Sequence, residues 1–169
     1  LADKVRAAAV RMESAMAAHK AAGDEKAAAR LKAELDRALA RIRGLDNKAI
    51  DTFQHAIAVN QGRDLWAAHY LMGRVYKRRG DFEKAVGPLE KALELCSATS
   101  SLQRLSVLGH ALTMIGIRSD LALTYYALDQ YYSSWTQIQA VERLGGEMPK
   151  DFTQKVELKV KEMSEDLKK

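Results

Sequence analysis

Apolar side chains recur with a helical period along most of the chain, and the pattern is clearest in residues 66–95. This stretch predicts two amphipathic helices, because apolar residues return every three or four positions on both sides of a short break. At the break, Gly80 can adopt the left-handed conformation that ends a helix, and Asp81 can cap the next one. We therefore predict a helix–turn–helix pair, with Gly73 and Ala85 where the two helices approach most closely.

This pair resembles the tetratricopeptide repeat, a helix–turn–helix motif of 34 residues. If Gly73 is the glycine at position 8 of that motif, the repeat spans residues 66–99. The residues that then match the family pattern are Met72, Gly73, Tyr76, Gly80, Phe82, Ala85, Leu89 and Ala92. The resemblance implies an all-α fold, a right-handed α-solenoid of antiparallel helix pairs.

A weaker copy of the motif precedes this repeat, at about residues 30–63. In this alignment Gly44 is the turn glycine, and the second helix of the copy begins after it. The matching positions in that second helix are Ala49, Phe53 and Ala56. The first helix of this copy departs from the pattern, as terminal repeats often do because one of their faces meets water.

Another weak copy follows, at about residues 115–148, with Ala122 at position 8, Asp129 in the turn and Ser134 in the second helix. Ser134 lies 49 residues after Ala85, which is one repeat plus 15 extra residues. Fifteen residues are about four helical turns. We favour one continuous helix over residues 102–128, and the alternative is a break near residues 116–120.

Both ends of the chain also predict helices. Residues 2–22 and 25–43 are rich in alanine and flank Gly23 and Asp24, which indicates a helical hairpin. Residues 149–168 form one amphipathic helix, which suits the exposed end of a solenoid. We expect a single domain, residues 1–169, made of an N-terminal hairpin (1–43), repeats (44–148) and a capping helix (149–169).

Composition adds few constraints. The net charge of +5 comes from basic residues that mostly alternate with acids, so a solvated helical surface explains it and nucleic acid is disfavoured as a partner. No apolar run is long enough for a membrane span. The chain starts at Leu1 without a methionine, which suggests a truncated or processed N-terminus. A cytoplasmic location is slightly favoured, and localisation is otherwise open.

Catalytic and metal-binding patterns are missing. The four histidines lie on different predicted helices without a ligand-spaced partner, and Cys96 is the one cysteine. The chain contains no HExxH, GxSxG or phosphate-binding glycine loop. We therefore expect no enzyme, no metal and no cofactor.

In the tetratricopeptide family, the first helices of successive repeats line a concave groove that receives peptides or helices. The resemblance carries this role to a set of residues on the two first helices: Tyr70, Arg74, Lys77, Arg78, Leu123 and Tyr126. One wall would be basic and the other mostly apolar, so we expect an acidic or amphipathic guest. Tyr132 and Trp135 form a second candidate interface, because surface aromatics are favoured in protein contacts.

These observations predict a non-enzymatic module that binds a peptide or helix of a partner protein. The alternative is a self-associating structural protein that pairs through the N-terminal hairpin or the long helix 102–128, which makes a homo-oligomer the competing assembly. A nucleic-acid-binding surface on Arg74, Lys77, Arg78 and Arg79 is a third reading, and it predicts binding that weakens steeply with salt.

Overall fold

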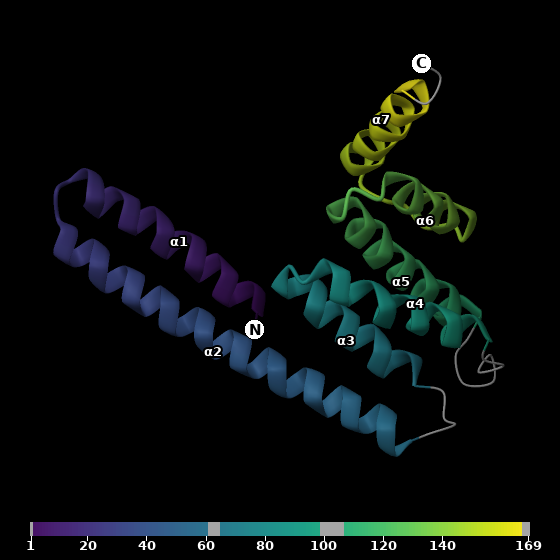
Figure 1. The fold of residues 1–169 in the computed structure, drawn as a ribbon, viewed down its shortest axis with the longest axis horizontal. Coiled ribbons are helices and arrows are strands. Elements are labelled where there is room, and N and C mark those ends of the chain that lie inside the picture. Colours follow the sequence, from purple (N-terminus) through teal and green to yellow (C-terminus); the bar gives the residue numbers. More distant parts are fainter. Residues whose placement is uncertain (1, 61–64, 99–106, 167–169) are drawn as a thin grey trace. The chain divides into compact units, whose positions relative to one another are not determined.

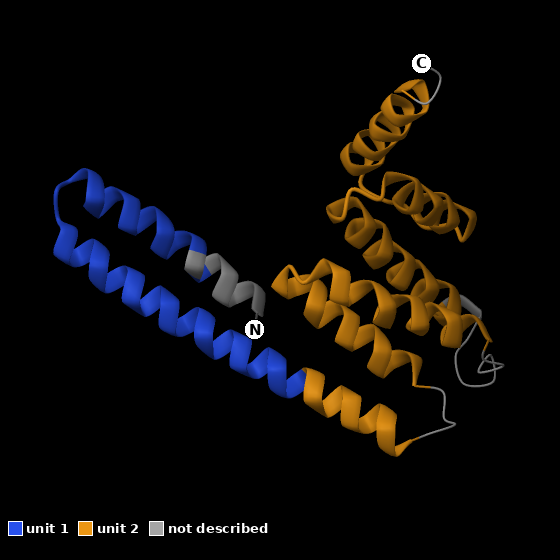
Figure 2. Cartoon of the chain, viewed as in Figure 1, with its two compact units in different colours: residues 1–49 blue, residues 50–169 orange. Residues whose placement is uncertain are grey.

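The computed structural model describes residues 2–60, 65–98 and 107–166, with the side chains of 2–7, 9, 107 and 108 outside the description (Figure 1). Within these ranges the chain forms helices and no strand, which confirms the all-α class. The helices are α1 (Ala2–Ala21), α2 (Glu25–Val59), α3 (Trp66–Arg79), α4 (Phe82–Ala98), α5 (Val107–Ala127), α6 (Tyr131–Arg143) and α7 (Lys150–Asp166). The chain divides into two compact units, residues 1–49 and 50–169 (Figure 2).

Unit 1 contains α1 and most of α2, joined by the turn expected at Gly23 and Asp24. Gly23 has a φ of 76°, in the left-handed region where glycine is favoured. The N–H of Asp24 donates to the carbonyl of His19 at 2.9 Å, and the Asp24 carboxylate accepts from the N–H of Ala27 at 3.0 Å. One short turn therefore ends α1 and caps α2, and the two helices run in opposite directions (Figure 1).

The turn expected at Gly44 is absent, because α2 continues through this residue to Val59. The second helix of the copy at residues 30–63 therefore does not begin there. A single glycine inside a helix costs only about 1 kcal/mol, and strong helix formers such as Arg41 and Lys48 stand on both sides of it. The apolar stripe also continues across Gly44, from Leu35 to Ile50, both of which are buried.

Unit 2 contains two helix pairs, α3–α4 and α5–α6, whose turns have the same geometry. In the first turn Gly80 has a φ of 82°, and the N–H of Asp81 donates to the carbonyl of Tyr76 at 3.0 Å. In the second, Asp129 has a φ of 58°, and the N–H of Gln130 donates to the carbonyl of Tyr125 at 2.9 Å. Each bond joins the residue after the left-handed position to a carbonyl in the last helical turn, as in a Schellman cap.

In both pairs, the two helices also approach each other closely at the equivalent position. A Cβ on Gly73 of α3 would lie 3.3 Å from the carbonyl oxygen of Ala85 on α4. At the equivalent place, the hydroxyl of Ser134 on α6 donates to the carbonyl of Ala122 on α5 at 2.8 Å. Ala85, Ala122 and Ser134 are all fully buried. Small side chains let the backbones of each pair come close, and the sequence predicted this for Gly73 and Ala85.

Helix α5 runs unbroken from Val107 to Ala127, so the break considered near residues 116–120 is not present. Residues 102–106 of the predicted long helix lie outside the described residues. At least some of the 15 residues in excess of one repeat therefore lengthen α5, the first helix of the second pair. Its continuity is physically reasonable because residues 107–127 contain no proline and only two glycines.

The described core of unit 2 includes the following two apolar clusters. The first joins α4 to α5 through fully buried Leu89, Ile117 and Leu121, with Tyr70 and Tyr76 of α3 against it. The second joins α5, α6 and α7 through Ala122, Ile138 and Val156. Helix α7 thus buries its apolar face on the last helix pair, and α5 is the helix common to both clusters.

Candidate functional site

The first candidate site lies where α3 and α5 meet. Asp120 on α5 accepts a hydrogen bond from the ammonium of Lys77 on α3. The second carboxylate oxygen of Asp120 lies 3.5 Å from Nε of Arg74. Two of the predicted basic groove residues therefore converge on one carboxylate that the sequence analysis did not single out.

Tyr70 fills the space beside this ion pair. A Cβ on Gly116 of α5 would lie 3.2 Å from the Tyr70 hydroxyl, so glycine at this position makes room for the ring. The Arg74 guanidinium lies over the same ring, 5.6 Å from its centroid, in the range of a cation–π contact. Burial, followed by the charge of Asp120, raises the pKa of Tyr70 to about 12.

The charge of this site remains positive. Arg74 and Lys77 face one carboxylate, which leaves one positive charge in the group. Exposure differs among the three side chains, because 57% of Arg74 is accessible against 22% of Lys77 and 14% of Asp120. Arg74 is therefore the most exposed member of this set.

Arg78 and the α5 residues of the predicted groove have different surroundings. Arg78 is partly buried, and its Nε is shielded from solvent. Leu123 is 39% exposed. Tyr126 packs edge-on against Tyr131 at 5.5 Å and against Phe152 at 5.2 Å between ring centroids. Tyr126 is thus also a packing residue between α5 and the last two helices.

The two residues of the second predicted interface, Tyr132 and Trp135, also differ in their surroundings. Tyr132 is 44% exposed, whereas Trp135 packs against the cluster that joins α5, α6 and α7. Tyr125 is buried and donates its hydroxyl proton to Glu90 of α4. Burial and the bond to Glu90 raise the pKa of Tyr125 well above its usual range. Tyr132 is therefore the most exposed of the aromatic residues between positions 125 and 135.

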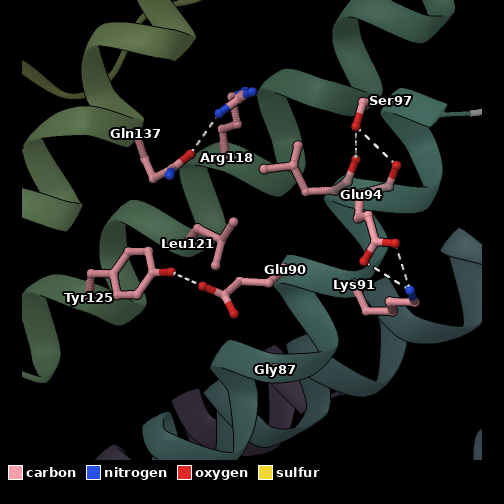
Figure 3. A pocket seen from close by; sticks show the side chains of 10 residues that line it. Gly87, Glu90, Lys91, Glu94, Ser97, Arg118, Leu121, Tyr125 and Gln137 are labelled. Atoms are coloured by element: carbon pink, nitrogen blue, oxygen red, sulfur yellow. Dashed lines mark hydrogen bonds and ion pairs between the residues drawn. The ribbon is translucent and has the colours of Figure 1, made fainter.

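A pocket of about 520 Å³ lies between α4, α5 and α6, and the sequence analysis did not predict it (Figure 3). Helix α5 contributes Arg118, Leu121 and Tyr125, which share one face because they are three or four residues apart. The remaining lining residues are Gly87, Glu90, Lys91, Leu93, Glu94, Ser97 and Gln137. A sequence signal for it did exist, since Arg118 is a charged residue within the most apolar part of α5.

The described residues contain no cluster of three or more His, Cys, Asp or Glu side chains placed to hold a metal ion. Cys96 is 1% exposed, and its sulfur lies 3.9 Å from Nδ1 of His110. No helix in the described ranges is long and apolar enough to cross a membrane.

A scan against protein-family models and searches of curated proteins and of solved structures found no match to this chain.

Proposed function

We propose that α3 to α7 form a short right-handed solenoid of the tetratricopeptide type, and that its α3–α5 face binds a peptide or helix of a partner protein. The repeated turn supports the solenoid, because the caps at Gly80 and Asp129 lie 49 residues apart and have the same hydrogen bonds. The buried small residues at the two close approaches support it as well. Helix α7, which covers the apolar end of the last pair, acts as the capping helix.

The observation that carries the binding function is the convergence of Tyr70, Arg74 and Lys77 on α5, the helix that also carries the exposed Leu123. Arg74 has an accessible guanidinium fixed over an aromatic ring, and a fixed guanidinium loses less entropy when it binds a carboxylate. Leu123 is three residues after Asp120 on α5, which places both on neighbouring turns of one helix face. The guest is therefore an acidic amphipathic segment, with a carboxylate for Arg74 and an apolar side chain for Leu123.

A fluorescence-anisotropy titration tests this function. The probes are two labelled peptides of equal length, one alternating Glu and Leu residues and one alternating Lys and Leu residues. The Glu peptide should bind more tightly, and Arg74→Glu should weaken its binding about tenfold or more, since the substitution replaces attraction with repulsion. Arg78→Glu should have a smaller effect, because Arg78 is more buried.

The matched control is Lys84→Glu, an exposed residue on α4 with the same change in net charge. If the protein attracts the Glu peptide only through its overall positive charge, Lys84→Glu and Arg74→Glu should weaken binding equally. That result would contradict the assignment of the site to Arg74. A Lys peptide that binds as tightly as the Glu peptide would contradict the acidic guest.

Self-association is the second candidate function, and exposed apolar residues of unit 1 favour it. Val10 is 61% exposed, Leu39 is 39% exposed and Leu45 is 51% exposed, so the hairpin leaves apolar surface that a second copy of the chain would bury. Light scattering over a range of protein concentrations separates the two functions. A stable dimer that Leu39→Lys and Leu45→Lys convert to a monomer supports self-association, and a monomer at every concentration supports the binding module alone.

A further inference from the structure

The pocket between α4, α5 and α6 contains an arginine whose hydrogen-bonding capacity is mostly unused. The guanidinium of Arg118 has five N–H donors. One of them, on Nη1, donates to the side-chain oxygen of Gln137 at 2.9 Å. The Nε of Arg118 is buried and has no hydrogen-bond acceptor in the described part of the chain. A buried donor without an acceptor is costly. Because Nε is shielded from solvent, a ligand in the pocket would have to meet this side chain at its other atoms.

No carboxylate among the described residues forms an ion pair with Arg118. Burial lowers the pKa of Arg118, and the nearby positive charge of Arg143 lowers it further. Both effects disfavour a positive charge here, yet a guanidinium stays protonated in proteins. Arg118 therefore has a like-charged neighbour and no ion-pair partner among the described residues.

The two acidic residues that line the same pocket already have partners. Glu90 accepts a hydrogen bond from the hydroxyl of Tyr125, and Glu94 is paired with Lys91 at 2.7 Å. Figure 3 shows these two pairs apart from the Arg118–Gln137 pair, with Leu121 between Arg118 and Glu90. The pocket therefore contains one arginine without a carboxylate partner beside polar groups that have partners, and Leu93 adds partly exposed apolar surface.

We infer that this pocket is a second binding site, for a ligand that carries one carboxylate on a short aliphatic body. The Arg118 guanidinium binds the carboxylate, and the amide N–H₂ of Gln137 adds a donor beside it. Leu93, which is partly exposed, contacts the aliphatic part. A volume of about 520 Å³ is within the range of small-molecule sites, roughly 300–1,000 Å³. The ligand is a free aliphatic acid or the C-terminal residue of a peptide, since both present the same chemistry.

This site is independent of the α3–α5 face, because its lining comes from α4, α5 and α6. Either site can be present without the other. The two sites are also distinguished by substitution, since Arg74 belongs to the first and Arg118 to the second.

Nuclear magnetic resonance titration tests the inference, with the Nε–H signal of Arg118 as the direct reporter. The probes are N-acetyl-leucine, its uncharged amide N-acetyl-leucinamide, and sodium acetate. N-acetyl-leucine should shift the Arg118 Nε–H signal in a saturable way and bind at least about tenfold more tightly than the amide. It should also bind more tightly than acetate, which lacks the aliphatic body. A pentapeptide that ends in leucine, with a free or an amidated C-terminus, distinguishes a peptide ligand from a small acid.

Arg118→Gln should abolish the response, whereas Arg74→Gln should leave it unchanged. N-acetyl-leucine and its amide are compared on the unsubstituted protein. This comparison therefore tests the site even if Arg118→Gln is unstable. Equal affinity for the acid and the amide, or no saturable shift with any probe, would overturn the site. Equal affinity for acetate and N-acetyl-leucine would overturn the aliphatic part of the assignment.

Discussion

Asp120 of α5 accepts a hydrogen bond from Lys77 of α3, and this bond joins the first helices of the two helix pairs in unit 2. The two side chains are mostly buried, at 14% and 22% exposure. A charge pair that is largely shielded from water is screened less by salt than one on the surface. The contact should therefore contribute measurably to the stability of the folded protein.

The first prediction concerns Asp120→Asn, which keeps the size of the side chain and removes its charge. The substitution should lower the free energy of unfolding by about 1–2 kcal/mol, because hydrogen bonds to charged groups contribute more than neutral ones. Urea unfolding followed by circular dichroism measures this loss. The control is Glu94→Gln, whose exposed pair with Lys91 should contribute less than about 0.5 kcal/mol. Equal losses in the two variants would show that the Asp120 contact stabilises the protein no more than an exposed ion pair does.

Gly73→Ala is the second prediction, and it tests the close approach of α3 and α4. The added Cβ would lie 2.6 Å from Cγ of Leu89, which is fully buried, so a side chain in the core would have to shift. Overpacking of this kind costs about 1–3 kcal/mol, so the melting temperature should fall. Gly44→Ala is the matched control. Its Cβ meets nothing within 4 Å inside α2, so it should stabilise the chain by about 0.5–1 kcal/mol. A loss of stability in Gly44→Ala would contradict a continuous α2.

The third prediction compares the left-handed residues in the turns of the two helix pairs, Gly80 and Asp129. Asp129 has a φ of 58°, a conformation that costs a residue with a side chain about 1–2 kcal/mol. Asp129→Gly should therefore raise the free energy of unfolding by about 0.5–1 kcal/mol, after the loss of the exposed bond from the Tyr131 hydroxyl. The reverse change at the equivalent turn, Gly80→Asp, should lower stability by a similar amount. Thermal unfolding of both variants measures these changes. If both substitutions raised stability, or both lowered it, the two turns would not be equivalent.

The fourth prediction is a dependence of stability on alkaline pH. The pKa of Tyr70 is raised from 10.0 to about 12 in the folded protein, so between these values the folded chain keeps a proton that the unfolded chain releases. Stability from this group is therefore fully present below pH 10 and is lost as pH rises toward about 12. Urea unfolding at several alkaline pH values should show a steeper decline for the unsubstituted protein than for Tyr70→Phe. Parallel declines would mean that Tyr70 does not titrate in this range.

Local features of the fold could be read from single residues and their spacing. Gly23 and Gly80 ended helices as expected, because a left-handed φ is easily reached only by glycine. The close approach at Gly73 was also predictable, since a helix pair needs small residues where its axes are nearest. The same reasoning failed at Gly44, because a glycine permits a turn but does not require one, and the apolar stripe of α2 continues beyond it.

The candidate sites were less predictable than the helices. Arg74 and Lys77 could be identified as neighbours on one helix face, but their shared partner, Asp120, is 43 residues after Lys77 in the chain. The pocket around Arg118 was missed for the same reason, since its walls come from three helices. Tyr126 was expected in the groove, and only the tertiary structure shows its ring against Phe152 of α7.

By itself, the sequence determined the helical class, the positions of most helix ends and the residues small enough for close packing. These properties depend on backbone preferences and on spacing over one or two helical turns, which a short segment carries within itself. The tertiary structure alone decided which charges are paired, which aromatic rings are covered and where a pocket forms. Those properties depend on distances between side chains from different helices, and such distances are set only when the helices pack together.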